Sequence, residues 1–186
     1  MDVLIKSVTI VDESSSHHLK KRDILIEGGI IKKIAASIER KNISLVEKNG
    51  MHVSPGWIDM NANLQDPGFE HKETIESGLK AAAAGGFTTV AVSALTQPVR
   101  DSKAQVEYLV NQSKNSIVST LPYGSVSNDA KGEELAEMND MRISGAVAFS
   151  DGKNSIANPN LLQRALLYAK SFDGLVMNYP NTREVA

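Results

Sequence analysis

The chain has 186 residues, of which 41% are hydrophobic, and a formal net charge of -2, which predicts an ordinary globular protein. Its basic residues are dispersed, no apolar run approaches the ~20 residues that cross a bilayer, and its start lacks a signal peptide, so we expect a cytoplasmic protein without nucleic acid or membrane partners. The absence of cysteine excludes disulfides, thiolate zinc sites and cysteine nucleophiles.

Residues 1–54 have the pattern of short β-strands joined by turns. Strands are predicted at 3–11 and within 23–34, where Gly28-Gly29 suits a hairpin turn. From residue 55 onward the pattern changes to strands that alternate with helices, which predicts parallel βα units. We therefore expect two parts, residues 1–54 and residues 55–186.

The second part is expected to contain five strands and four helices. The strands are predicted at 52–60, 88–93, 117–123, 145–150 and 174–179, and the helices at 74–84, 102–113, 131–141 and 158–172. The last helix has an apolar stripe at helical spacing, and Asn158-Pro159 is a typical helix start. We interpret that stripe as a packing face.

The segment 54–68 carries the most informative pattern, Ser-Pro-Gly-Trp-Ile-Asp-Met-Asn-Ala-Asn-Leu-Gln-Asp-Pro-Gly. Residues two apart on a strand point to the same face, so Asn61 and Asn63 lie side by side near its carboxyl end. Alone, such a pair is ordinary polar alternation. Zinc prefers imidazole, thiolate and carboxylate to a neutral amide oxygen, so we predict that Asn61 and Asn63 do not hold catalytic zinc.

This segment resembles the first barrel strand of the amidohydrolase superfamily, and most closely that of the dihydroorotases, which read Pro-Gly-x-Ile-Asp-x-His-x-His-Leu-Arg-x-Pro-Gly. The similarity continues through residues 71–78 and 81–90. The resemblance implies an α/β fold with a partial (β/α)8 amidohydrolase barrel at 55–186, preceded by a small β-sandwich segment at 1–54. Asn61 and Asn63 replace the two metal-binding histidines, and Gln65 replaces the arginine that clamps the substrate carboxylate.

The same resemblance identifies three further site positions. Leu95 stands where an asparagine helps to bind the substrate carboxylate, and Asn178 stands where a histidine binds metal. Asp151 survives from the family's Phe-Ser-Asp-Asp-Gly segment and is the only candidate metal ligand. The resemblance implies zinc in active relatives. For this chain, the residues at these positions predict no metal or other cofactor, and they do not allow a catalytic residue to be assigned.

The predicted elements make up only part of an eight-stranded barrel, which needs ~250 residues. We therefore expect a fragment of a longer protein. An open half-barrel exposes strand edges, so we also expect a homo-oligomer, self-association of the fragment, or coverage by later residues.

The resemblance implies two alternative functions. The first is a catalytically inactive dihydroorotase homologue of pyrimidine biosynthesis that acts as a structural or regulatory partner of aspartate transcarbamoylase, as inactive members of the family do. The second is an active amidohydrolase that hydrolyses a cyclic amide with an altered metal site built from Asp59, Asp66, Asp151 and residues beyond 186. A third hypothesis is that the emptied barrel mouth binds a different small ligand through its asparagine amides.

Overall fold

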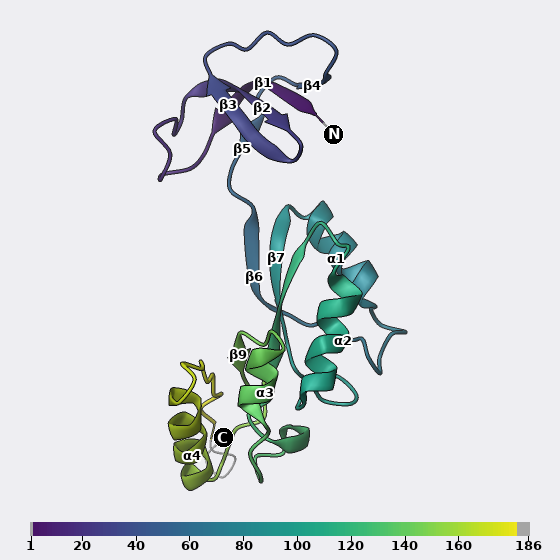
Figure 1. The fold of residues 1–186 in the computed structure, drawn as a ribbon, viewed down its shortest axis with the longest axis vertical. Helices are drawn as coiled ribbons and strands as arrows, with labels where there is room; N and C mark the ends of the chain where they lie inside the picture. Colours follow the sequence, from purple (N-terminus) through teal and green to yellow (C-terminus); the bar gives the residue numbers. More distant parts are fainter. Residues whose placement is uncertain (1, 182–186) are drawn as a thin grey trace. The chain divides into compact units, whose positions relative to one another are not determined.

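The computed structural model describes residues 2–181, and the chain divides into two compact units with the boundary between Pro55 and Gly56 (Figure 1). None of the helices in the described residues is long and apolar enough to span a membrane.

The first unit is a five-stranded sheet in the order β3-β2-β1-β4, with β5 also paired to β1. Its strands are β1 (Val3–Ile10), β2 (Lys21–Glu27), β3 (Ile30–Ala35), β4 (Ser44–Glu47) and β5 (His52–Val53). Gly28 and Gly29 join β2 to β3 with φ angles of 59° and 78°, which confirms the predicted hairpin turn. A β-sandwich consists of two sheets, whereas the described residues of this unit form a single sheet.

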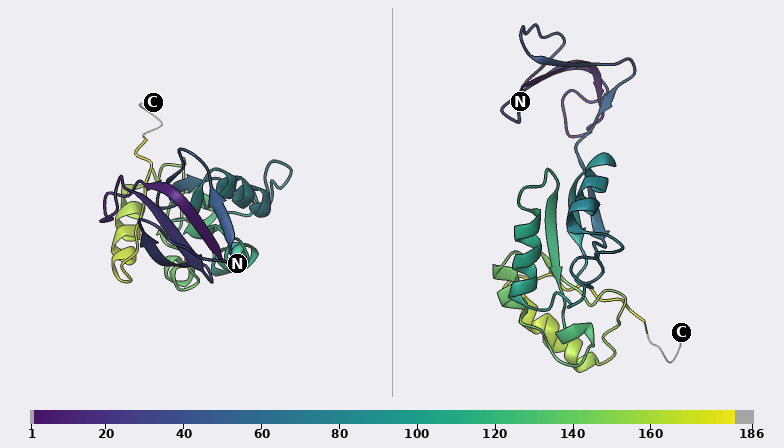
Figure 2. Two further views of the ribbon diagram at one scale, coloured as in Figure 1. Left: turned by 90° about the horizontal axis from the view of Figure 1, so that it is seen from above. Right: turned by 90° about the vertical axis from the view of Figure 1, so that its right-hand side faces the viewer.

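The second unit has a parallel sheet in the order β6-β7-β8-β9, with helices between its strands (Figures 1 and 2). The strands are β6 (Trp57–Ala62), β7 (Phe87–Val92), β8 (Ser119–Gly124) and β9 (Ala148–Phe149). The helices are α1 (Ile75–Ala84), α2 (Lys103–Ser113), α3 (Met138–Ile143) and α4 (Pro159–Lys170), with a 3-10 turn at Asn128–Ala130. This order confirms the predicted parallel βα units.

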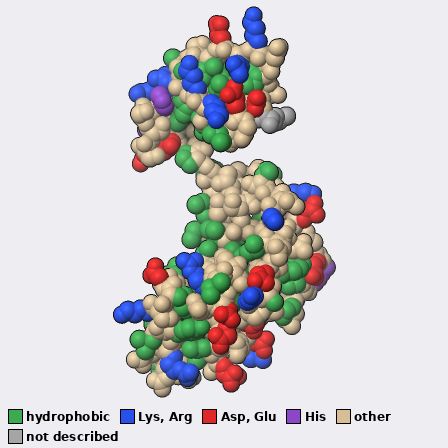
Figure 3. Space-filling view, in the orientation of Figure 1, with side chains coloured by type: hydrophobic (Ala, Val, Ile, Leu, Met, Phe, Trp, Pro, Cys, Tyr) green, Lys and Arg blue, Asp and Glu red, His purple; other side chains and the backbone are tan. Residues whose placement is uncertain are grey.

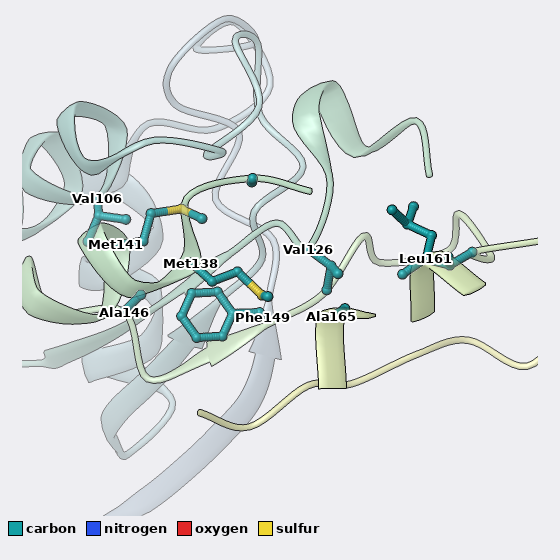
Figure 4. Close-up of a cluster of buried hydrophobic side chains, with 10 residues drawn as sticks. Val106, Val126, Met138, Met141, Ala146, Phe149, Leu161 and Ala165 are labelled. Atoms are coloured by element: carbon teal, nitrogen blue, oxygen red, sulfur yellow. The ribbon is translucent and has the colours of Figure 1, made fainter. Parts of the chain in front are cut away.

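The core of the second unit lies mainly between the sheet and its helices. Val90 and Val92 of β7 pack with Leu79 of α1 and Leu109 of α2. A second cluster surrounds Phe149 of β9 and joins α2, α3 and α4 (Figure 4). Because alternate residues of a strand point to opposite faces, Ala91 belongs to a separate cluster with Tyr123 and Ala148 on the other face.

Three of the four predicted helices are confirmed, with boundaries that differ by at most two residues. Thr74, Ser102 and Asn158, which were expected to be their first residues, are the N-cap residues of α1, α2 and α4. N-cap residues lie half outside the helix, so the difference reflects where a helix is said to begin.

The predicted helix at 131–141 is wrong in its first half, because α3 begins at Met138. Gly132 has a φ angle of 71°, which a right-handed helix does not allow. Its N–H donates to the hydroxyl of Ser127, and Leu135 forms an antiparallel bridge with Ser127. Contacts with the segment after β8 therefore replace helical hydrogen bonds over residues 131–137.

The predicted strands at 52–60, 145–150 and 174–179 are also corrected. The first is divided between two sheets, since β5 pairs with β1 of the first unit and β6 begins at Trp57. Pro55 lies between them and has no N–H to continue a ladder. Strand β9 is two residues long, and the stretch 174–179 contributes one parallel bridge, between Val176 and Phe149.

Candidate active site of the half-barrel

The six predicted site positions all lie at or after the carboxyl ends of the parallel strands. Asn61 is the second-last residue of β6, and Asn63 and Gln65 follow this strand. Leu95 follows β7, Asp151 follows β9, and Asn178 follows the bridge at Val176. Carboxyl ends of parallel strands meet at one edge of a sheet, and this is the edge at which barrel enzymes build their active sites.

The loops after β6 and β7 are in direct contact. The N–H of Gln97 donates to the carbonyl of Pro67 at 3.0 Å. Gly68 has a φ angle of 101°, and a Cβ atom there would lie 2.2 Å from the carbonyl oxygen of Gln97. Only glycine allows this approach, which brings the segment after Gln65 against the segment after Leu95.

Leu95 packs on the turn that contains Asp151. A Cβ atom on Gly152 would lie 2.5 Å from Cδ1 of Leu95, so the leucine side chain lies directly over that glycine. The structure therefore brings these two site positions together through an apolar contact. Leu95 cannot donate a hydrogen bond from its side chain to a substrate carboxylate.

Asp151 is 3% exposed, and its carboxylate is directed at the segment after β8. Its Oδ1 accepts the N–H groups of Val126 at 2.8 Å and Ser127 at 3.1 Å, and its Oδ2 accepts the hydroxyl of Ser127. Three donors thus hold both oxygens in place. In this arrangement the carboxylate fixes the loop after β8.

Asn61 and Asn63 are exposed and line a hollow of about 300 Å³ at β6, together with Asp59, Glu73 and residues of α1. Asp59 Oδ1 accepts the N–H of Asn61 at 2.9 Å. Asn178 lines a different hollow of about 740 Å³, formed by residues 129–133, 154–157 and 180–181. The structure does not place these three asparagines in one hollow.

Tyr123 connects β8 to β6 beside this site. Its hydroxyl donates to the carbonyl of Met60 at 2.6 Å, across β7, where the small side chain of Ala91 belongs to the same cluster. Burial, and secondarily the nearby carboxylate of Asp59, raises the pKa of the Tyr123 hydroxyl. Tyr123 therefore remains a neutral donor at physiological pH.

Asp66 was a candidate ligand of an altered metal site, and its carboxylate has two donors. Oδ1 accepts the Tyr108 hydroxyl at 2.8 Å, and Oδ2 accepts the N–H of Ile75, the first residue of α1, at 3.3 Å. The hydrogen bond to Asp66 raises the pKa of Tyr108 to about 12. Sequence reasoning missed this contact, because the two residues are 42 positions apart and follow no shared pattern.

The donor chemistry of these residues does not fit a catalytic zinc ion. Asn61, Asn63 and Asn178 offer amide oxygens, and the carboxylate of Asp151 already accepts three hydrogen bonds. Among residues 2–181, no group of three or more His, Cys, Asp or Glu side chains is arranged to hold a metal ion. Zinc sites in enzymes use three such side chains as ligands.

The parallel half-barrel is shared with solved amidohydrolases. An L-hydantoinase from Arthrobacter aurescens superposes with a TM-score of 0.74 at 21% identity, over 94% of this chain and 40% of that one. A dihydroorotase superposes with a TM-score of 0.67 at 14% identity, over 95% of this chain and 50% of that one. At these identities the similarity shows the fold, a partial amidohydrolase barrel, as the sequence predicted.

Sequence comparison shows the family. Residues 50–186 match the family described as dihydro-orotase-like. The dihydroorotase of Acetivibrio thermocellus is 40% identical over 185 residues, which cover 99% of this chain and 43% of the relative. That of Ruminiclostridium cellulolyticum is 37% identical over 180 residues, or 96% of this chain and 42% of the relative. The chain belongs to the dihydroorotase-like family and spans less than half the length of these relatives.

Proposed function

We propose that the complete protein is a cytoplasmic dihydroorotase homologue of pyrimidine biosynthesis that does not catalyse the reaction. The observation that carries this proposal is the donor set at the strand ends. Asn61, Asn63 and Asn178 supply neutral amides, and the carboxylate of Asp151, at the position of a metal-binding aspartate in the family pattern, is engaged by Val126 and Ser127.

The residues at the substrate-binding positions support the same proposal. In a dihydroorotase, metal polarises the carbonyl of a cyclic amide and supplies hydroxide from bound water. The substrate carboxylate also needs a cationic partner, for which a guanidinium gives two parallel charge-assisted hydrogen bonds. Gln65 has neither the charge nor the paired N–H donors of an arginine. Leu95 covers Gly152 with an apolar side chain.

The test of inactivity is a steady-state assay of the complete protein with dihydroorotate and, in the reverse direction, carbamoyl aspartate. Each reaction is run before and after addition of zinc, beside an active dihydroorotase as the control. We expect no turnover above the buffer blank in either direction. Zinc-dependent turnover that scales with protein concentration would contradict the proposal.

We further propose that the complete protein serves as a structural or regulatory partner of aspartate transcarbamoylase. This proposal rests on the resemblance to inactive family members. Exposed apolar side chains on the second unit (Figure 3) are consistent with a covered surface; Trp57, Ile58 and Met60 of the edge strand β6 are 59%, 56% and 64% exposed.

The partnership is tested by sedimentation of the complete protein with aspartate transcarbamoylase from the same organism. A faster-sedimenting complex of fixed stoichiometry is expected. Independent sedimentation of the two proteins at micromolar concentrations would contradict the partnership and leave the proposal of inactivity standing.

The alternative function is an active amidohydrolase with an altered metal site. One observation favours it: the hollow at β6 brings Asp59 and Glu73 together with Asn61 and Asn63, and oxygen ligands of this kind suit a hard cation such as Mg²⁺. Turnover of a cyclic amide that requires Mg²⁺ or Mn²⁺, and is lost in Glu73→Gln, would establish this alternative.

A further inference from the structure

Arg100 is a fully buried arginine in the loop between β7 and α2, with an exposed fraction of 0%. Its Nη1 donates to the carbonyl of Ser93 at 2.8 Å, with longer contacts to the carbonyls of Tyr123 at 3.4 Å and Val92 at 3.5 Å. One nitrogen of the guanidinium therefore joins the carboxyl ends of β7 and β8. Neither the family pattern nor the proposed function uses this residue.

The other two nitrogens of Arg100 are buried without acceptors. Within residues 2–181, Nε and Nη2 have no hydrogen-bond partner, and the ion pairs of this part of the chain do not include Arg100. Burial lowers the pKa of Arg100 to about 10, so the group remains charged at neutral pH. A buried charge without a counter-ion destabilises a folded protein.

The geometry of these two nitrogens indicates which kind of acceptor fits them. In a guanidinium, Nε–H and one N–H of Nη2 lie parallel along the same edge. This edge matches the two oxygens of a carboxylate, which accept both hydrogen bonds and neutralise the charge. A water molecule or a backbone carbonyl supplies no charge and does not match both donors.

We propose that the Nε–Nη2 edge of Arg100 binds one carboxylate that residues 2–181 do not supply. The carboxylate has two chemically equivalent sources: an Asp or Glu side chain elsewhere in the complete protein, or a small carboxylate ligand. The inference is independent of the proposed function, since it concerns a different residue and holds for an active or an inactive protein.

Because Nε and Nη2 are buried, a carboxylate reaches this edge only if a neighbouring segment of the chain moves. The loop 95–99 is held by the contact of Leu95 with Gly152 and by the hydrogen bond from Gln97 to Pro67. These contacts involve a flexible side chain and a single hydrogen bond. The backbone of Arg100 itself is fixed more firmly, because its N–H donates to Ala94 and its carbonyl accepts from Ser125, both at 2.9 Å.

The test compares thermal unfolding midpoints of the complete protein as wild type, R100M and R100K. Each is measured in chloride and in succinate, a small dicarboxylate probe, at equal ionic strength. R100M removes the charge and the donors, whereas R100K keeps a cation but loses the paired edge. R142K is the matched control, because Arg142 is exposed and also donates through Nη1 to a carbonyl, that of Ala146.

If the carboxylate is a ligand, succinate raises the wild-type midpoint by several degrees over chloride, and neither Arg100 variant responds. If the complete protein supplies it, succinate has no specific effect, both Arg100 variants unfold several degrees lower because an acid is left unpaired, and a crystal structure of the complete protein shows that acid at Nε and Nη2. R142K behaves as wild type in both cases.

The proposal is overturned if succinate has no effect and R100K unfolds at the wild-type temperature. A crystal structure of the complete protein is the second measurement, and it keeps the test decisive if a variant fails to fold. It must show carboxylate oxygens within hydrogen-bonding distance of both Nε and Nη2. Water alone at this edge would also overturn the proposal.

Discussion

At the scale of single residues, Asp151 has a structural role at the strand ends. Its carboxylate is buried and accepts two backbone N–H groups and one hydroxyl from Val126 and Ser127. Ser127 in turn accepts the N–H of Gly132 at 2.8 Å. The aspartate therefore determines the course of the loop after β8.

Replacing Asp151 with asparagine should destabilise the protein. One of the carboxylate oxygens becomes an NH2 group, which cannot accept from a buried donor, so we expect a loss of about 2–3 kcal/mol in the free energy of unfolding. Denaturant unfolding of the complete protein measures it. Asp140→Asn, at an exposed position, is the control and should cost less than about 0.5 kcal/mol. Equal losses in the two variants would contradict the structural role of Asp151.

The pair of Tyr108 and Asp66 predicts a specific pH dependence. The folded-state pKa of Tyr108, raised to about 12, exceeds its ordinary value of 10.0. The pair therefore stabilises the fold below pH 10, and this contribution is lost as the pH rises from ~10 through ~12. Subtracting the tyrosinate absorbance of Y108F from that of the wild type isolates the signal of Tyr108. This difference should titrate near pH 12. In D66N the midpoint should fall toward 10; an unchanged midpoint would refute the assignment.

At the scale of helices and strands, local signals account for what could be predicted. Helices α1, α2 and α4 follow the N-cap residues Thr74, Ser102 and Asn158, which are of types that favour this position, and apolar periodicity marks the buried faces of the helices. The start of α3 could not be predicted, because residues 131–137 are held by Ser127, which itself depends on Asp151. Such long-range contacts leave no periodic signal in the sequence.

The same distinction applies to the candidate site. The spacing of Asn61, Asn63 and Gln65 in a family pattern located the strand end correctly. Val126 and Ser127, which donate to the Asp151 carboxylate, are 25 and 24 residues away from it in the sequence. The carbonyls that accept hydrogen bonds from Arg100 lie at the carboxyl ends of two different strands. Sequence reasoning could therefore place these residues at the strand ends but could not predict what their side chains contact.

The caps of α1 and α2 predict different sensitivities at the two helix starts. Thr74 accepts the N–H of Ser77 and forms a capping box with it, whereas the Ser102 side chain accepts no backbone N–H of its helix and its hydroxyl donates to the Gln105 side chain. T74A should therefore cost about 1 kcal/mol of unfolding free energy. S102A should cost clearly less, and both are measured by denaturant unfolding. A greater loss for S102A would contradict this assignment.

At the scale of the whole molecule, introducing the family's metal and substrate ligands should not produce catalysis. The combined variant N61H, N63H, N178H and Q65R returns the family's imidazoles and guanidinium to their positions. Leu95 would still cover Gly152, and the Asp151 carboxylate would still be engaged by the loop after β8. We expect no dihydroorotate turnover by the complete variant with zinc. Appreciable turnover would show that these two features do not limit activity.

The central claim, that the strand ends of this half-barrel no longer hold a catalytic metal, is tested most directly by metal content. The complete protein is analysed by plasma mass spectrometry as purified and after incubation with zinc and gel filtration, beside an active dihydroorotase. We predict well below one zinc ion per chain in both samples. Zinc that approaches one ion per chain, and that is lost when Asp151 is replaced, would contradict the claim.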